Sequence, residues 1–229
     1  MSVIPGGHPG FLAVAEAGAS APPAFTFIDS DAGSGAPTVA VNVPAAVIEG
    51  DLLVLATFGL RGAGDVSFSL ESGWTQVLLS TADRDRIVVQ VKVAETGDAG
   101  AALSTTNNSN SSEYNVVAAF RPDVPLASFT VHDTDSELTS AAPGNQTVTA
   151  SAGPVPLVVL GVWAGSSLGE ISPRGMSPAK DGERRAGPSS GSQMWLGWKI
   201  YNTAPSNVTV SMDDEYANNL LGSLYISGA

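Results

Sequence analysis

A short apolar run is the feature that most restricts how this chain can fold. The turn Glu49-Gly50-Asp51 opens onto residues 52–58, which are rich in Leu and Val, and Gly59 closes the run. Runs of this length and composition are typical of a strand that is buried on both faces or lies in a sandwich core. A second run, Pro156–Gly165, has the same character. We therefore expect two central strands, with the other segments arranged around them.

Shorter segments with alternating apolar residues flank both runs. Val39, Val41 and Val43 share one face of an extended segment, and residues 86–94 alternate in the same way. Gly, Pro, Asn and Asp separate these segments, and helical periodicity is nearly absent. The pattern predicts an all-β chain that folds as a two-layer, jelly-roll-like β-sandwich.

The order of segments in the first half of the chain recurs in the second half. Aligning Leu52 with Leu157 gives an offset of 157 − 52 = 105 residues, and aligning Lys92 with Lys199 gives 199 − 92 = 107. Similar order at a nearly constant offset indicates an internal pseudo-repeat of about 105 residues. Convergence of plain β-patterning is the alternative, because identity between the halves is low.

Two domain arrangements are compatible with this pattern. The halves, about 25–122 and 123–229, form either one sandwich or two tandem sandwiches. Each half alone offers a small core, and the connecting stretch 121–146 contains a candidate strand rather than a flexible spacer. We therefore expect a single β-sandwich domain over residues 25–229.

Residues 1–24 differ from the rest of the chain because they are rich in Gly, Ala and Pro. We expect them to form a short N-terminal arm outside the sandwich. The arm is either a disordered terminus or an anchor that becomes ordered against a partner. In the second case Phe11, Leu12 and Val14 are the candidate anchor residues.

The charge balance argues against several classes of partner. The chain has 10 Lys and Arg against 22 Asp and Glu, a net charge of −12, so phosphates of nucleic acids and anionic membranes would be repelled. No apolar run approaches the ~20 residues that span a bilayer. The chain has no cysteine for disulfides or metal ligation, and its start lacks the basic segment of a signal peptide.

Residues with catalytic or metal-binding chemistry are few. The histidines are His8 and His132, and neither a Gly-x-Ser-x-Gly elbow nor a phosphate-binding Gly loop is present, so we expect no enzymatic activity and no cofactor. Asp-x-Asp pairs can clamp a hard cation such as Ca²⁺. The candidate metal ligands are Asp133, Asp135 and Glu137, although such groups also arise by chance in an acidic chain.

Aromatic residues gather on predicted strands of the second half. They are Trp163, Trp195, Trp198 and Tyr201. Trp195 and Trp198 have opposite parity, so at most one of them faces the core. An exposed Trp can stack on a sugar or fill a protein interface. The alternative is that both are packed beneath the long irregular stretch 166–192.

The order of motifs resembles that of a known group of proteins. Gly50-Asp51-Leu52-Leu53-Val54 is followed by Ser72-Gly73-Trp74-Thr75 and by apolar strands at 86–94 and 114–121. This order resembles β-sandwich proteins of tailed bacteriophages and prophages that are minor structural or tail-associated components. The similarity covers roughly residues 38–225. The second half departs from it, because Gly-Pro-Val-Pro replaces Gly-Asp-Leu and no second Gly-Trp-Thr follows.

The resemblance implies a non-enzymatic structural component of a phage virion, tail-associated or part of a fibre that faces the host receptor. Such a protein would assemble in the host cytoplasm, leave by lysis and be present in several symmetric copies. Its arm would bind other virion proteins, and its sandwich would face outward toward a host surface glycan. The alternatives are a capsid decoration or head-fibre protein and a free carbohydrate-binding module.

Overall fold

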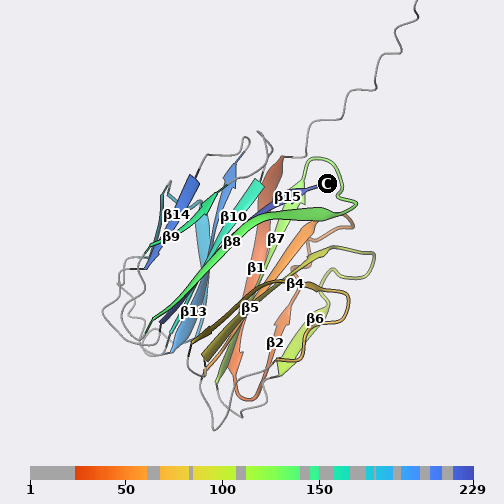
Figure 1. Ribbon diagram of the computed structural model, residues 1–229. Helices are drawn as coiled ribbons and strands as arrows, with labels where there is room; N and C mark the ends of the chain where they lie inside the picture. Colours follow the sequence, from red (N-terminus) through yellow and green to blue (C-terminus); the bar gives the residue numbers. More distant parts are fainter. Residues whose placement is uncertain are drawn as a thin grey trace, which may run out of the picture.

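The computed structural model describes most of the chain outside its N-terminal segment. The described residues are 24–60, 68–82, 85–106, 112–139, 145–149, 157–165, 174–177, 179–187, 192–201, 207–212 and 219–229. Within them the chain forms fifteen β-strands and no helix, which confirms the all-β prediction (Figure 1). Helices able to cross a membrane are therefore also lacking from this part of the chain. The predicted arm, with Phe11, Leu12 and Val14, lies outside the described residues except for Ala24.

Seven strands belong to the first half of the chain. They are β1 (Phe25–Gly35), β2 (Thr38–Asn42), β3 (Leu52–Gly59), β4 (Thr75–Ala82), β5 (Asp85–Val93), β6 (Ala102–Thr106) and β7 (Glu113–Pro122). The second half contains β8 (Phe129–Thr139), β9 (Asn145–Thr149), β10 (Leu157–Gly165), β11 (Arg174–Ser177), β12 (Gly182–Ala186), β13 (Gln193–Tyr201), β14 (Asn207–Met212) and β15 (Asn219–Gly228).

Two five-stranded antiparallel sheets form the centre of the molecule. The first has the strand order β1-β7-β3-β5-β4 and the second has the order β12-β13-β10-β15-β8. A two-stranded sheet, β2-β6, accompanies the first, and a three-stranded sheet, β11-β14-β9, accompanies the second. Figure 1 shows β2 and β6 on one side of the molecule and β9 and β14 on the other.

The largest hydrophobic core lies between the two five-stranded sheets. Leu52, Val54 and Phe58 of β3 share it with Leu160 and Val162 of β10. Burial of these alternating side chains from both sheets supplies most of the apolar area that stabilises a sandwich. The face-to-face packing of the two sheets confirms the prediction of a β-sandwich.

The two apolar runs are buried on their other faces as well. Leu53 and Leu55 pack beneath the β2-β6 sheet, and Val159 and Trp163 pack beneath the β11-β14-β9 sheet. Strands without a polar face require such a cover, because an exposed row of Leu and Val would remain in contact with water. The small sheets therefore add outer layers to the predicted sandwich of two layers.

The two halves correspond in strand order. In the order β8-β15-β10-β13-β12, the strands of the second sheet correspond to β1, β7, β3, β5 and β4 of the first sheet. A bulge interrupts β1 at Ile28 and β8 at His132, an offset of 132 − 28 = 104 residues. Contacts between β1 and β12 are matched by contacts between β8 and β4, as expected if an approximate two-fold axis relates the halves. These features support the predicted pseudo-repeat, while its origin by duplication stays a prediction.

Candidate functional site

The Gly-Asp motif residues connect the start of β3 to the segment between the halves. Gly50 has φ of +87°, and a Cβ there would lie 2.5 Å from Cβ of Pro125. The almost fully buried Asp51 carboxylate accepts hydrogen bonds from Arg121 Nε at 3.1 Å, from Arg121 Nη2 at 2.9 Å and from Ile48 N at 2.8 Å. The motif therefore has a structural role, because it holds a loop, a strand and the linker together.

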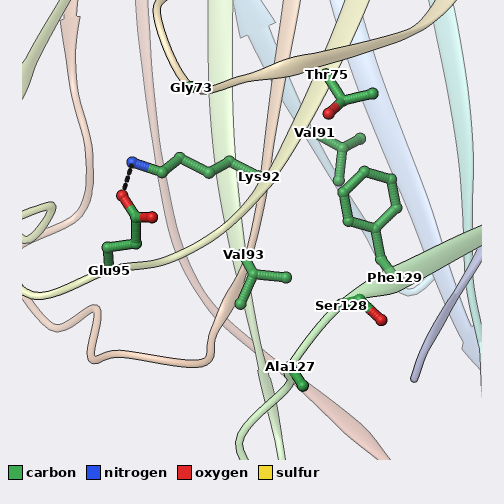
Figure 2. A pocket seen from close by; sticks show the side chains of 9 residues that line it. All are labelled: Gly73, Thr75, Val91, Lys92, Val93, Glu95, Ala127, Ser128 and Phe129. Atoms are coloured by element: carbon green, nitrogen blue, oxygen red, sulfur yellow. Dashed lines mark ion pairs between the residues drawn. The ribbon is translucent and has the colours of Figure 1, made fainter.

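The Gly-Trp-Thr motif lies beside an open cleft of about 480 Å³ where the two halves meet. Gly73, at φ of +81°, and Thr75 line the cleft together with residues of β5 and residues 127–129. Figure 2 shows Lys92 and Glu95 on one side of the cleft and Val91 and Phe129 on the other. The cleft thus combines a charged wall with an apolar wall.

The charged wall of the cleft is already neutralised by neighbouring side chains. Lys92 Nζ lies 3.0 Å from a carboxylate oxygen of Glu95 and 3.0 Å from one of Asp98. Burial alone would lower the pKa of Lys92, but its hydrogen bonds to Asp98 and Glu95 raise that pKa above its ordinary value. Because two carboxylates surround one ammonium group, the cleft offers little attraction to an anion.

The predicted metal ligands Asp133 and Asp135 bind backbone amides at the bulge of β8. Asp133 Oδ1 accepts from Thr134 N at 2.9 Å, and Asp135 Oδ2 accepts from Thr147 N at 3.2 Å. The side chain of Glu137 lies outside the described part of the structure. Among the described residues no group of three or more His, Cys, Asp or Glu side chains is close enough to hold a metal ion.

The same arrangement occurs in the first half, at Asp29 and Asp31 of β1. Asp29 Oδ1 accepts from Ser30 N at 2.8 Å, and Asp31 Oδ2 accepts from Asn42 N at 2.8 Å. In both halves the Asp carboxylates accept hydrogen bonds from backbone amides where the edge strand bends toward its small sheet. A structural role therefore accounts for both Asp pairs.

His132, the bulged residue of β8, contacts a serine of the neighbouring strand. Its Nε2 lies 2.7 Å from Oγ of Ser227 on β15. Burial lowers the pKa of His132 below its ordinary value. Ser227 is only 4% exposed, so its hydroxyl joins the two strands and is not presented to a substrate.

Trp198 and Trp195 lie on opposite faces of β13, as their parity predicts. Trp198 is buried between the two large sheets, where it stacks on Phe27 at a centroid distance of 4.3 Å and meets Phe120 edge-on at 6.1 Å. Trp195 is half-buried at the margin of the outer core. Trp198 therefore belongs to the core, and of these two residues only Trp195 is available to a partner.

Trp163 lies flat on the outer face of the second sheet over two paired glycines. A Cβ at Gly161 would lie 2.8 Å from Cη2 of the Trp163 ring, and a Cβ at Gly197 would lie 2.5 Å from its Cζ3. Both glycines therefore leave the space that the indole occupies. Trp163 is fully buried, so it cannot itself stack on a ligand.

Three basic side chains on or beside β12 and β13 lie over three aromatic rings, one on β10 and two on β13. Lys180 Nζ is 5.7 Å from the Trp163 ring, Arg185 Cζ is 5.4 Å from the Trp195 ring, and Lys199 Nζ is 6.0 Å from the Tyr201 ring. These distances are within the range of cation–π attraction. We call these six residues the cation–ring strip.

Two carboxylates complete the strip. Glu183 lies 2.9 Å from Lys180 Nζ, and Asp181 lies 2.5 Å from Lys199 Nζ. Burial, with a smaller effect from Asp181, raises the pKa of Tyr201 to about 12, so this phenol remains neutral. The strip therefore combines ion-paired basic groups, neutral rings and two carboxylates on one face of the second sheet.

Sequence reasoning found the rings of the strip and missed its charged residues. Lys180, Asp181, Glu183 and Arg185 fall in the stretch 166–192, which the sequence predicted to be irregular because it is rich in Gly and Pro. The structure instead has β11 and β12 within that stretch. The pairing of Arg185 with Trp195 depends on the register of β12 against β13, for which the sequence carries no turn signal.

Fold and site together define an all-β sandwich protein with an aromatic and basic lateral surface. Comparison with family models, with curated proteins and with solved structures finds no match for this chain.

Proposed function

We propose that this chain is a non-enzymatic structural component of a tailed bacteriophage virion, tail-associated or part of a fibre, that faces the host receptor. The observation that carries the proposal is the role of the motif residues behind the resemblance. Gly50 and Asp51 connect a loop, β3 and the linker, and Gly73 lies where the halves meet. Motifs that maintain a rigid frame suit a particle component more than an enzyme.

The positions of two chain segments support an anchor at one end of the molecule. Ala24 N donates to Asp123 Oδ1 at 2.9 Å, and Ala229 exchanges backbone hydrogen bonds with Ser128 at 3.0 and 3.2 Å. Ala24 and Ala229 are therefore both attached to the linker between the halves; Figure 1 marks the C-terminal residue at the upper end of the molecule. An arm of residues 1–24 would bind other virion proteins at this end and leave the lateral sheets exposed.

Antibody labelling of purified phage particles, viewed by electron microscopy, tests the proposal. Label at the tail tip or tail side is the expected result. Label over the head would replace the tail assignment by a capsid decoration or head-fibre role. Protein found only free in the lysate, with the epitope shown to be accessible, would overturn the virion assignment and favour a free carbohydrate-binding module.

Deletion of residues 1–24 tests the proposed anchor separately. Because the described strands begin at Phe25, the shortened protein should fold but fail to join particles. The measurement is quantitative immunoblotting of purified particles, with circular dichroism as the control for folding. Incorporation at the level of the full chain would contradict an anchoring role for Phe11, Leu12 and Val14.

A further inference from the structure

We infer that the cation–ring strip is a binding surface for an acidic glycan, that is, a sugar chain bearing carboxylate or sulfate groups. The inference names the ligand of the receptor-facing role and rests on the proposed function. It differs from the sequence-based expectation of a tryptophan platform, because Trp163 and Trp198 are buried. The groups available to a ligand are instead the basic side chains and the partly exposed edges of Trp195 and Tyr201.

Two rings of the strip, Trp195 and Tyr201, lie at the margin of the cover that the three-stranded sheet provides, and Trp163 lies beneath it. That sheet packs on β10 and β15, whose residues Val159, Leu221 and Tyr225 form the outer core. Trp195 and Tyr201 are only partly buried at the margin of this core. The side chains of Lys180 and Lys199 each remain 24% exposed.

The basic groups are held in place before any ligand arrives. The Lys180 stem crosses Gly197, since its Cδ would lie 3.6 Å from a Cβ at that position. Asp181 fixes Lys199 and also accepts a hydrogen bond from Ile200 N at 2.8 Å. Long basic side chains normally lose conformational entropy on binding, and a surface that has already ordered them avoids part of that cost.

The spacing of the basic groups suits a linear ligand. Along β13, Arg185 is paired with Trp195 and Lys180 lies over Gly197. Lys199, two residues further along the strand, is the third basic residue. Alternate residues of a strand are about 6.6 Å apart, so the three groups span roughly 13 Å in a row. Such a row can contact successive acidic groups of a short oligosaccharide, and Arg185 can grip a carboxylate or sulfate with two donors.

The charge of the strip contrasts with that of the rest of the chain. The strip and its two carboxylates contain Lys180, Arg185 and Lys199 against Asp181 and Glu183, a net charge of 3 − 2 = +1, which leaves −12 − 1 = −13 elsewhere. An anionic ligand would therefore be directed to this face. A long polyanion such as nucleic acid would extend onto the negatively charged surface outside the strip and be repelled there. A short acidic sugar chain therefore fits better.

The first half of the chain supplies an internal comparison. By strand register, Lys92 corresponds to Lys199, because each is paired with a core residue of the central strand, Leu53 and Val159 respectively. Val88 and Ala94 occupy the places of Trp195 and Tyr201 by the same offset of 107 residues. The rings are thus present in the second half alone, as expected if the strip serves a function beyond folding.

Calorimetric titration of the purified full chain tests the inference. The probes are tetragalacturonate, its methyl ester, and a heparin-derived tetrasaccharide. We expect at least one acidic probe to bind, with an affinity that falls as salt is added, and the methyl ester to bind about tenfold more weakly or not at all. Arg185→Gln and Lys199→Gln should each weaken binding by about tenfold, and Lys92→Gln, the matched control, should leave it unchanged.

The outcomes separate this inference from the proposed function. Absence of binding to both acidic probes, equal binding of the methyl ester, or equal loss in Lys92→Gln would overturn the acidic-glycan surface. A single-stranded DNA oligonucleotide that binds as tightly would overturn it in favour of a general anion surface. Should Arg185→Gln fail to fold, Lys199→Gln carries the test. Particle labelling is independent of these titrations, so either proposal can fail while the other stands.

Discussion

Asp51 illustrates how one buried carboxylate can join distant parts of this chain. Its three hydrogen bonds connect the loop before β3 with Arg121 at the end of β7. Asp51→Ala would leave the Ile48 amide without its acceptor and remove two of the hydrogen bonds of Arg121, which keeps Ala46 O as an acceptor, so we expect the free energy of unfolding to fall by about 1–3 kcal/mol. Urea denaturation measures the change. Glu49→Ala removes an exposed carboxylate from the same turn and should cost less than ~0.5 kcal/mol.

His132 should make stability depend on pH. Because burial lowers its pKa in the folded state, the unfolded chain binds the proton more readily. Protonation of His132 therefore does not affect stability well above the ordinary His pKa of about 6.5. The free energy of unfolding decreases as the pH falls below that value. We expect His132→Gln to flatten the curve of unfolding free energy between about pH 6.5 and pH 5 relative to the wild type. Parallel curves for both proteins would contradict this role.

Single residues differ in how far the sequence determines their place. The opposite faces of Trp195 and Trp198 follow from parity alone, which the structure confirms. The partners of Lys180 and Arg185 could not be predicted, since they depend on β12 lying beside β13. The hydrogen bonds that Asp133 and Asp135 accept from backbone amides could not be predicted either, since they depend on how β8 bends toward β9.

At the scale of elements, two paired glycines of β10 and β13 leave room for one ring on the outer face of the second sheet. Gly197→Ala would place a methyl group against Cζ3 of Trp163, so we expect a loss of about 1–3 kcal/mol. Trp163→Leu removes the ring edge that causes the clash. In that background Gly197→Ala should cost less, with a coupling energy of about 1 kcal/mol in a double-mutant cycle measured by urea denaturation. Additive losses would show that the glycine is needed for another reason.

Elements were predictable where composition alone decides their environment. Residues 52–58 and 157–164 have no polar face, and burial on both faces follows from that. The sequence showed the strands of the small sheets only as separate alternating segments such as residues 38–42. The order in which strands pair within a sheet could not be inferred from such local patterns. The strands at 174–177 and 182–186 were missed, since short edge strands carry little hydrophobic signal.

For the whole molecule, the main question is whether the halves fold as one unit. The largest core includes side chains from both five-stranded sheets, so neither half can bury its inner face alone. Hydrogen bonds add to this connection, because Leu126 N of the second half donates to Gly50 O of the first at 3.0 Å. The pseudo-repeat predicted from the sequence is compatible with one sandwich or two, and we expected one because each half alone offers a small core. Side-chain parity on β3 and β10 could not show that the two inner faces meet.

Leu160→Ala distinguishes one cooperative unit from two independent domains. Leu160 is fully buried in the core between the sheets, so its truncation should cost about 2–5 kcal/mol. In a single unit, the most protected amides of β3 and β10 should lose the same free energy of opening, because both strands exchange only when the whole molecule unfolds. Hydrogen exchange monitored by NMR measures both strands in one sample. Leu79→Ala, at a 47% exposed position, is the control and should change neither. Loss of protection confined to β10 would instead indicate tandem domains that unfold separately.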